Sequence, residues 1–281
     1  MQSRSLPYLL LLPATIFLVA FFLWPFVQVA IEAFTRDGSV TLDHFRVMVN
    51  DWKFVPALRN TLLLAMVIVP LQLALALTMA SLVTRMGAGR DVVLYMWTIP
   101  LGISDLAAGL VWLAILERNG FLNSILQAVG LVAQPITWLG YQNTVTLFVA
   151  VVLAELWRST AIVMVILVAG MGLIPKEYYE AAEVFGAGPW KRFVKVTLPL
   201  LRPSLQTALI LRTILAFEVF GVVAALAGTN LPILMGQTFE WQFALQDRNV
   251  AAALAMVTLA ISIGFTLFYL FALRTRDEAR V

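Results

Sequence analysis

Long apolar stretches alternate with short charged segments along the whole chain. Six of the stretches are long enough to cross about 30 Å of hydrocarbon as helices. The pattern therefore predicts an all-α polytopic membrane protein, formed as one transmembrane domain over residues 1–281. We expect its six helices at about 6–31, 61–83, 92–116, 144–172, 205–227 and 251–273.

The composition agrees with this class of protein. Hydrophobic residues make up 61% of the chain and charged residues only 12%, which is too apolar for a soluble domain of this length. Arg4 precedes the first stretch as in a signal peptide, but the stretch is too long for a cleaved leader, so we expect a retained helix. The sequence has no cysteine, which excludes a disulfide framework. We interpret the single histidine, His44, as a solvated loop residue and not as a metal ligand.

Lys and Arg are distributed unevenly between the predicted loops. If both termini lie in the cytoplasm, eleven of these nineteen cations fall on the inner side, six on the outer side and two within the apolar stretches. The excess favours this orientation, because the inner loops of membrane proteins carry more Lys and Arg. The inner cations are Arg4, Arg85, Arg90, Lys176, Lys191, Arg192, Lys195, Arg202, Arg274, Arg276 and Arg280.

The longest charged segment between two apolar stretches is 174–203. Its prolines predict two short helices, Pro175 to Phe185 and Pro189 to about Val196, because proline is tolerated at the first helical position. Gly186 follows the first helix and can adopt the left-handed conformation that ends a helix. Cations outnumber acids in the segment, so it should face the cytoplasm.

The same segment resembles the EAA loop of the membrane-spanning subunits of ATP-binding-cassette (ABC) importers. The resemblance rests on a glutamate followed by two alanines, a glycine six residues after the glutamate, and a Leu-Pro pair, which here are Glu180, Ala181, Ala182, Gly186, Leu198 and Pro199. In that family the first helix of the loop docks into a cleft of the cytoplasmic ATPase subunit. The resemblance implies that these residues, with Phe185 where the family usually has an acid, couple the chain to an ATPase.

Ionisable residues also occur within the predicted membrane helices. Each costs at least about 2.5 kcal/mol at mid-bilayer unless it is paired or faces water. Glu155 and Arg158 are three residues apart, so they share a helical face and can pair. The full set is Asp105, Glu155, Arg158, Arg212 and Glu218.

Aromatic residues accompany these charges. Trp157 lies beside the first pair, and Phe217 and Phe220 flank Glu218. Charged groups among aromatic rings suit a polyhydroxylated ligand, whose hydroxyls hydrogen-bond to charges while its C–H faces stack on rings. The alternative is that the charges only pair with one another and hold helices or subunits together.

The stretches 155–160 and 211–220 are similar to segments of the permeases that import disaccharides, oligosaccharides and glycerol phosphate. The resemblance implies a sugar as cargo and a location in the bacterial inner membrane. It implies as partners a second, homologous permease in a heterodimer, two ATPase subunits that bind the ATP and magnesium, and an extracellular or periplasmic solute-binding protein. No cofactor or metal is expected on this chain. The implied substrate pathway consists of Glu155, Trp157, Arg158, Arg212, Phe217 and Glu218.

The sequence does not predict an enzyme. It has no GxxxxGK[ST] phosphate loop, and one histidine without cysteine supplies no Ser/His/Asp or Cys/His set. We predict a transport subunit that alternates between inward and outward access, driven by separate ATPases. The alternatives are another cargo, such as glycerol phosphate or an amino acid, and a gradient-driven transporter, which would usually have the repeated halves that we do not find here.

Overall fold

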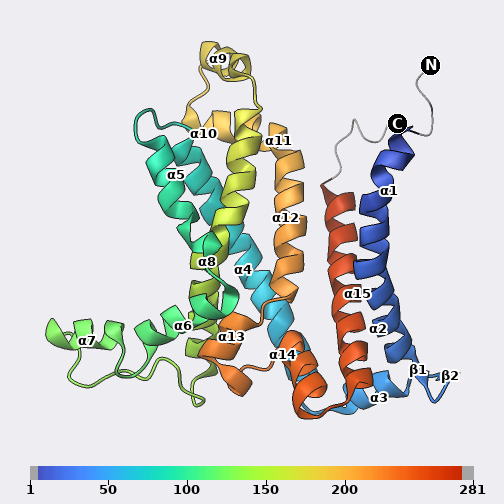
Figure 1. Cartoon of the computed structure of the whole chain (residues 1–281). Helices are drawn as coiled ribbons and strands as arrows, with labels where there is room; N and C mark the ends of the chain where they lie inside the picture. The colour runs from blue at the N-terminus through green and yellow to red at the C-terminus, as the bar shows by residue number, and fades with distance from the viewer. Residues whose placement is uncertain (1–5, 274–281) are drawn as a thin grey trace.

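The protein is described by a computed structural model that covers residues 6–273; the predicted inner cations Arg4, Arg274, Arg276 and Arg280 lie outside these residues. The chain is almost entirely helical (Figure 1). Four helical segments are long and apolar enough to cross a membrane, and two bent helix pairs bring the number to six if each pair counts as one span. The prediction of an all-α polytopic membrane protein is therefore confirmed.

The first span is one continuous helix with a π-helical section. It consists of α1 (Leu6–Leu18), η1 (Val19–Leu23) and α2 (Trp24–Phe34), and it continues past the predicted end at residue 31. A hairpin of β1 (Thr35–Arg36) and β2 (Ser39–Val40) follows, and then α3 (Asp43–Asn50). The span lies beside the last helix, α15 (Arg248–Ala272), at the edge of the molecule (Figure 1).

Three helices form the centre of the molecule: α4 (Phe54–Val83), α8 (Thr144–Gly172) and α12 (Arg202–Phe217). Along one half of the α4 and α8 contact, Ala76 and Ala80 pack on Val163, Met164 and Leu167, all of them buried. The alanines allow the two backbones to approach closely, as small residues do between membrane helices. α4 begins at Phe54, seven residues before the predicted start, so part of the expected outer segment is helical.

The third predicted helix is interrupted. The chain forms α5 (Arg90–Thr98) and the 3₁₀ helix η2 (Ile99–Gly102), bends, and continues as α6 (Asp105–Leu116) and α7 (Phe121–Ala128), with 100° between the two halves. Pro100 lacks the N–H that a continuous helix needs, and the Ser104 hydroxyl caps the new helix by accepting the N–H of Ala107 at 3.2 Å. The helix predicted at about 92–116 is therefore divided into two helical parts with a bend between them.

The fifth predicted helix is interrupted as well. α12 ends at Phe217, and α13 (Gly221–Leu226) begins after three non-helical residues, so the single helix predicted over 205–227 is wrong. The Asp105 carboxylate of α6 accepts the N–H groups of Phe220 and Gly221 at 3.3 and 2.5 Å, which stabilises the start of α13. The chain then passes through η4 (Gly228–Asn230), α14 (Leu234–Phe239) and η5 (Glu240–Ala244) to α15.

The segment between α8 and α12 contains α9 (Lys176–Val184) and a helical run made of α10 (Pro189–Arg192), η3 (Phe193–Thr197) and α11 (Leu198–Leu200). This run bends by 70° into α12. In Figure 1, α9 lies at one end of the molecule, beyond the other helices, and α3 lies at the opposite end. We call these the α9 end and the α3 end.

Two polar side chains organise the α3 end. His44 is buried, contrary to the prediction of a solvated residue: its Nε2 lies 3.1 Å from the carbonyl oxygen of Thr35 and 3.2 Å from Asn249 of α15. Asn123 of α7 is also buried, and its carboxamide oxygen accepts the N–H groups of Ile136 and the Trp138 indole at 3.1 and 3.2 Å. Both side chains fix loops against helices.

Candidate functional site

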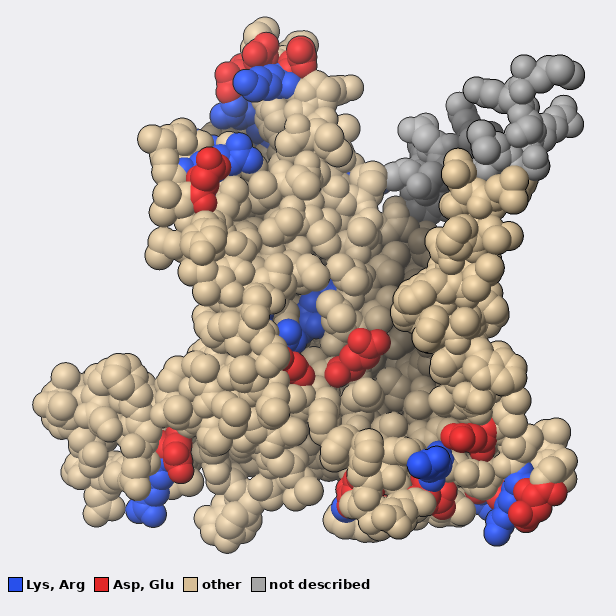
Figure 2. Space-filling view, in the orientation of Figure 1, with Lys and Arg blue, Asp and Glu red and all other residues tan. Residues whose placement is uncertain are grey.

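A cluster of charged and amide side chains lies between the central helices, away from both ends. We call Gln72, Asp105, Glu155, Arg158 and Arg212 the central charge cluster. They come from α4, α6, α8 and α12, so four helices that are distant in the sequence meet at this point. Figure 2 shows a small group of charged side chains at mid-height, apart from the charged side chains at the two ends of the molecule.

Glu155 is the centre of this cluster. Its side chain is completely buried and accepts hydrogen bonds from three groups: Arg212 Nη2 at 2.8 Å, Arg158 Nη2 at 3.2 Å and the Ser159 hydroxyl at 3.2 Å. Gln72 extends the network, since its amide nitrogen donates to the backbone carbonyl of Glu155 at 2.8 Å and its amide oxygen accepts from Arg212 Nε. A buried carboxylate in this apolar setting is tolerated because its charge is balanced and hydrogen-bonded.

Arg158 connects the buried part of the cluster to the interrupted helices. Its Nη2 lies 3.2 Å from Glu155 Oε1 and 3.3 Å from Asp105 Oδ1. The other oxygen of Asp105 holds the start of α13. One chain of polar contacts thus leads from α4 through α12, α8 and α6 to α13.

Some hydrogen-bonding atoms of the cluster remain unused. Arg212 Nη1 and Arg158 Nε are buried and have no hydrogen-bond partner among the described residues. Asp105 and Arg158 are partly exposed, at 31% and 22% of their side-chain surface, so the cluster is not fully enclosed. These features allow a bound polar molecule to complete the network.

The residues of the predicted substrate pathway differ in burial and in their contacts. The predicted pair of Glu155 and Arg158 is confirmed, and Arg212 joins it. Trp157 is partly exposed and packs edge-on against Trp112, with 6.4 Å between ring centroids. Phe217 is 1% exposed and packs on Phe265, so its ring is buried between helices.

Glu218 is an exposed acid that lies in the sequence between Arg212 of this cluster and Phe220. It caps the C-terminal end of α12, and no described residue forms an ion pair with it. Sequence reasoning left out two cluster members: Gln72 was not singled out, and Asp105 was recognised as a membrane charge but not placed in the pathway. The available signal for Gln72 was an amide side chain in the middle of a long apolar stretch.

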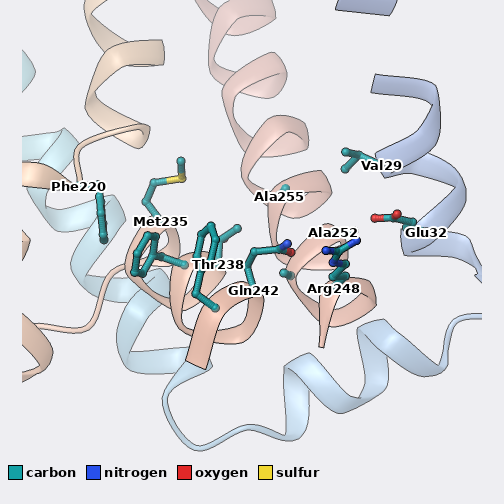
Figure 3. Close-up of a pocket in the computed structure, with 12 residues that line it drawn as sticks. Val29, Glu32, Phe220, Met235, Thr238, Gln242, Arg248, Ala252 and Ala255 are labelled. Carbon is teal, nitrogen blue, oxygen red and sulfur yellow. The ribbon is translucent and has the colours of Figure 1, made fainter. Parts of the chain in front are cut away.

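A pocket of about 270 Å³ lies between α2, α14, η5 and α15 (Figure 3). Three rings stack along one wall: Phe220 and Phe239 have centroids 5.0 Å apart, and Phe239 and Phe243 4.6 Å apart. Polar groups complete the lining, namely Glu32, Thr238, Gln242 and Arg248. Since Phe220 lies two residues after Glu218, the aromatic wall begins next to the central charge cluster.

The predicted coupling loop forms an exposed helix with a sharp end. α9 ends in a turn in which Gly186 has φ +71°, which confirms the left-handed conformation expected there. The Ala187 N–H donates to the Ala182 carbonyl at 2.9 Å and the Gly186 N–H to the Glu183 carbonyl at 2.8 Å. These two bonds define a Schellman motif, in which the glycine reverses the chain direction.

Few side-chain contacts attach α9 to the rest of the protein. The Tyr179 hydroxyl lies 3.3 Å from the Thr197 hydroxyl, and Glu183 pairs with Arg192 of α10. Of the predicted coupling residues, Ala182 and Leu198 are half-buried and the remainder are exposed, most of all Phe185 at 88%; these are Glu180, Ala181, Phe185, Gly186 and Pro199. A helix with an exposed phenylalanine at its end is suited to contact another protein.

The chain belongs to the family of binding-protein-dependent transport system inner membrane components, whose sequence profile matches residues 72–277. These are the permease subunits of ABC importers, so the predicted family is confirmed.

Individual relatives agree with this assignment. The chain is 31% identical over 235 residues to the trehalose/maltose transport system permease protein MalF of Thermococcus litoralis, covering 81% of this chain and 78% of the relative. It is 30% identical over 237 residues to the trehalose transport system permease protein SugA of Mycobacterium tuberculosis, covering 81% and 75%. A solved chain of a bacterial ABC transporter involved in the import of the acidic polysaccharide alginate has the same fold, with a TM-score of 0.82, 21% identity and 96% of each chain covered.

Proposed function

We propose that this chain is the permease subunit of an ATP-driven importer whose cargo is an uncharged di- or oligosaccharide. The observation that carries the proposal is the sequence position of the exposed Glu218, between Arg212 of the central charge cluster and Phe220 of the aromatic wall formed with Phe239 and Phe243. Sugars need hydrogen-bonding groups for their hydroxyls and ring faces for their C–H groups. The names of the relatives, which are trehalose, maltose and α-glucoside permeases among others, support the same cargo class.

The charges argue for a neutral cargo over a phosphorylated one. The two arginines of the central charge cluster are balanced by two carboxylates, Glu155 and Asp105. Glu218 adds one uncompensated negative charge at the accessible side, which opposes an anion. One relative, 29% identical, is an sn-glycerol-3-phosphate permease, so glycerol phosphate is the alternative that this charge argument has to exclude.

Transport requires partners that this chain does not contain. We propose a heterodimer with a homologous permease, two ATPase subunits and an extracellular solute-binding protein. One neighbouring solved structure is a bacterial alginate ABC transporter in complex with an alginate pentasaccharide-bound periplasmic protein, which supports the class of partner. The exposed α9, with Phe185 and the Gly186 turn, is the proposed contact to an ATPase.

The mechanism follows from how α9 is connected. α9 lies between α8 and the helical run that bends into α12, and both of these long helices carry cluster residues. Movement of a docked ATPase would displace α9 and tilt α8 and α12. This tilt would open the cluster alternately to the two sides of the membrane. In this proposal the α9 end faces the cytoplasm, in agreement with the Lys and Arg distribution.

The test is the ATPase rate of the purified complex in lipid nanodiscs with its binding protein. The panel contains disaccharides, oligosaccharides, monosaccharides, glycerol phosphates and amino acids. We expect stimulation by a disaccharide or oligosaccharide only. Stimulation by glycerol phosphate or an amino acid would overturn the cargo, and a complex that contains no ATPase would favour a gradient-driven transporter.

A further inference from the structure

A cationic cavity lies at the α9 end, apart from the central charge cluster. Its volume is about 480 Å³, and it is enclosed by the ends of α4 and α8, the start of α5, and α9 with η3. Four cations line it and no carboxylate does: Arg85, Arg90, Lys176 and Arg192. Figure 2 shows Lys and Arg side chains at this end of the molecule, with Asp and Glu side chains beside them on the surface.

The charge of this cavity is largely uncompensated. Only Arg192 has an ion-pair partner among the described residues, which is Glu183. Arg85, Arg90 and Lys176 have no carboxylate within 4.0 Å in the part of the chain that the structure describes. Three free cations around one cavity attract an anion.

An apolar groove adjoins the cavity and follows the surface of α4. It has a volume of about 570 Å³ and lies between α4 and α10, where Leu77, Leu82 and Trp190 line it. Ser81, Arg85 and Phe193 line both the cavity and the groove, so the two spaces adjoin. Leu82 and Trp190 are 57% and 76% exposed, so the groove is open at the surface of the chain.

A buried hydroxyl marks the junction of cavity and groove. The Ser81 Oγ is buried and has no hydrogen-bond partner among the described residues. Most buried hydroxyls have a partner, because burying one unpaired costs free energy. A ligand that supplies an acceptor at the junction would satisfy this hydroxyl.

We propose that the cavity and groove bind an anionic glycerophospholipid. The phosphate would lie among Arg85, Arg90 and Lys176 and accept from Ser81, while an acyl chain would follow the groove past Leu82 and Trp190. A cationic site next to an apolar channel matches the two chemically different ends of one lipid molecule, and basic pockets between membrane helices bind such headgroups. This inference requires only that the chain lies in a membrane, so it does not depend on the identity of the cargo.

The test measures which lipids the complete purified transporter retains. Native mass spectrometry after exposure to equal amounts of phosphatidylglycerol and phosphatidylcholine should show retained phosphatidylglycerol. Each cation near an anionic lipid contributes about fivefold in binding, so the double variant Arg85→Gln/Arg90→Gln should lower retention by roughly 25-fold. The control is Arg46→Gln, an exposed arginine at the α3 end, which should leave retention unchanged. Equal retention of the two lipids by the unmodified transporter, or an equal loss in the control, would overturn the proposal.

A second variant distinguishes a lipid-binding role of Ser81 from a structural role. Ser81→Ala removes a hydroxyl that has no partner in the described protein, so a purely structural role predicts unchanged retention. Binding of the phosphate at Ser81 predicts a loss of several-fold, on the order of one hydrogen bond to a charged group.

Two further outcomes would contradict the binding of a lipid at this site. Glycerol 3-phosphate carries the same phosphate without acyl chains, and it should not displace phosphatidylglycerol at equal concentration; full displacement would overturn the lipid in favour of a free phosphate compound. If Arg85→Gln/Arg90→Gln loses the ATPase subunits but retains phosphatidylglycerol, the cations serve subunit docking and the proposal is wrong.

Discussion

Asp105 of α6 and Gly221 of α13 are joined by a hydrogen bond of 2.5 Å from the Gly221 N–H to the carboxylate, across 116 positions of sequence. The backbones of α6 and α13 approach closely here, since a Cβ at Gly221 would lie 2.6 Å from the Leu106 nitrogen. The same carboxylate contacts Arg158 of the central charge cluster. The interruption after α12 is therefore held in place by another interrupted helix.

Replacing Asp105 should destabilise this region. Asp105→Ala removes the cap of α13 and one partner of Arg158, and we expect a loss of about 1–2 kcal/mol for the cap alone. Thermal unfolding of the purified complex, followed by size-exclusion chromatography, would measure the shift. Asp91→Ala is the matched control because Asp91 is an exposed acid in the first turn of α5. An equal shift in both variants would contradict this role of Asp105.

Gly186→Val should abolish ATP-driven uptake while membrane insertion stays normal. The space around Gly186 is open, so the cost arises from the positive φ, which is unfavourable by roughly 1–2 kcal/mol for a residue with a Cβ and more for a β-branched one. Uptake of labelled substrate into proteoliposomes, with immunodetection of the inserted chain, would measure both quantities.

Gly188→Val is the control for that variant. Gly188 also has open space around it, but its φ of −65° and ψ of 169° are accessible to valine, and an extended residue is favoured before Pro189. We expect near-normal uptake. Equal inhibition by both substitutions would show that bulk in the loop, and not the turn at Gly186, impairs coupling.

Glu218→Gln should change the response to substrate more than the assembly of the complex. Glu218 is exposed and has no ion-pair partner among the described residues, whereas a hydrogen bond to a charged group contributes enough for about a tenfold change in affinity. The substrate concentration for half-maximal ATPase stimulation would be measured, with Glu117→Gln as an exposed control. Loss of the complex would instead favour a structural role for Glu218.

We expect Arg212 to stabilise the protein mainly because it balances the buried charge of Glu155. Arg212→Met leaves a fully buried carboxylate with one fewer cation, which costs roughly 3–5 kcal/mol. The double variant Arg212→Met/Glu155→Leu removes both charges and should be less destabilised than the single variant. Thermal unfolding of the two variants tests this coupling, and additive losses would be evidence against it.

The sequence was sufficient for the fold class because apolar length and charge distribution are local properties. The Glu155 and Arg158 pair and the turn at Gly186 were predictable for the same reason, since their partners lie within a few residues. The interruption after Phe217 was not predictable, because the group that holds it, Asp105, comes from a distant helix. The burial of His44 was not predictable for the same reason, since its partner Asn249 is 205 positions away in the sequence.

The central charge cluster also determines where the molecule can bend. Its contacts tie α4, α8 and α12 together, so sliding these helices past one another would separate buried ion pairs at a cost of several kcal/mol. Rotation costs least where the helices are already interrupted, at the 70° bend before Arg202 and at residues 218–220. We therefore expect the three helices to move as one unit, with bending near each end of α12.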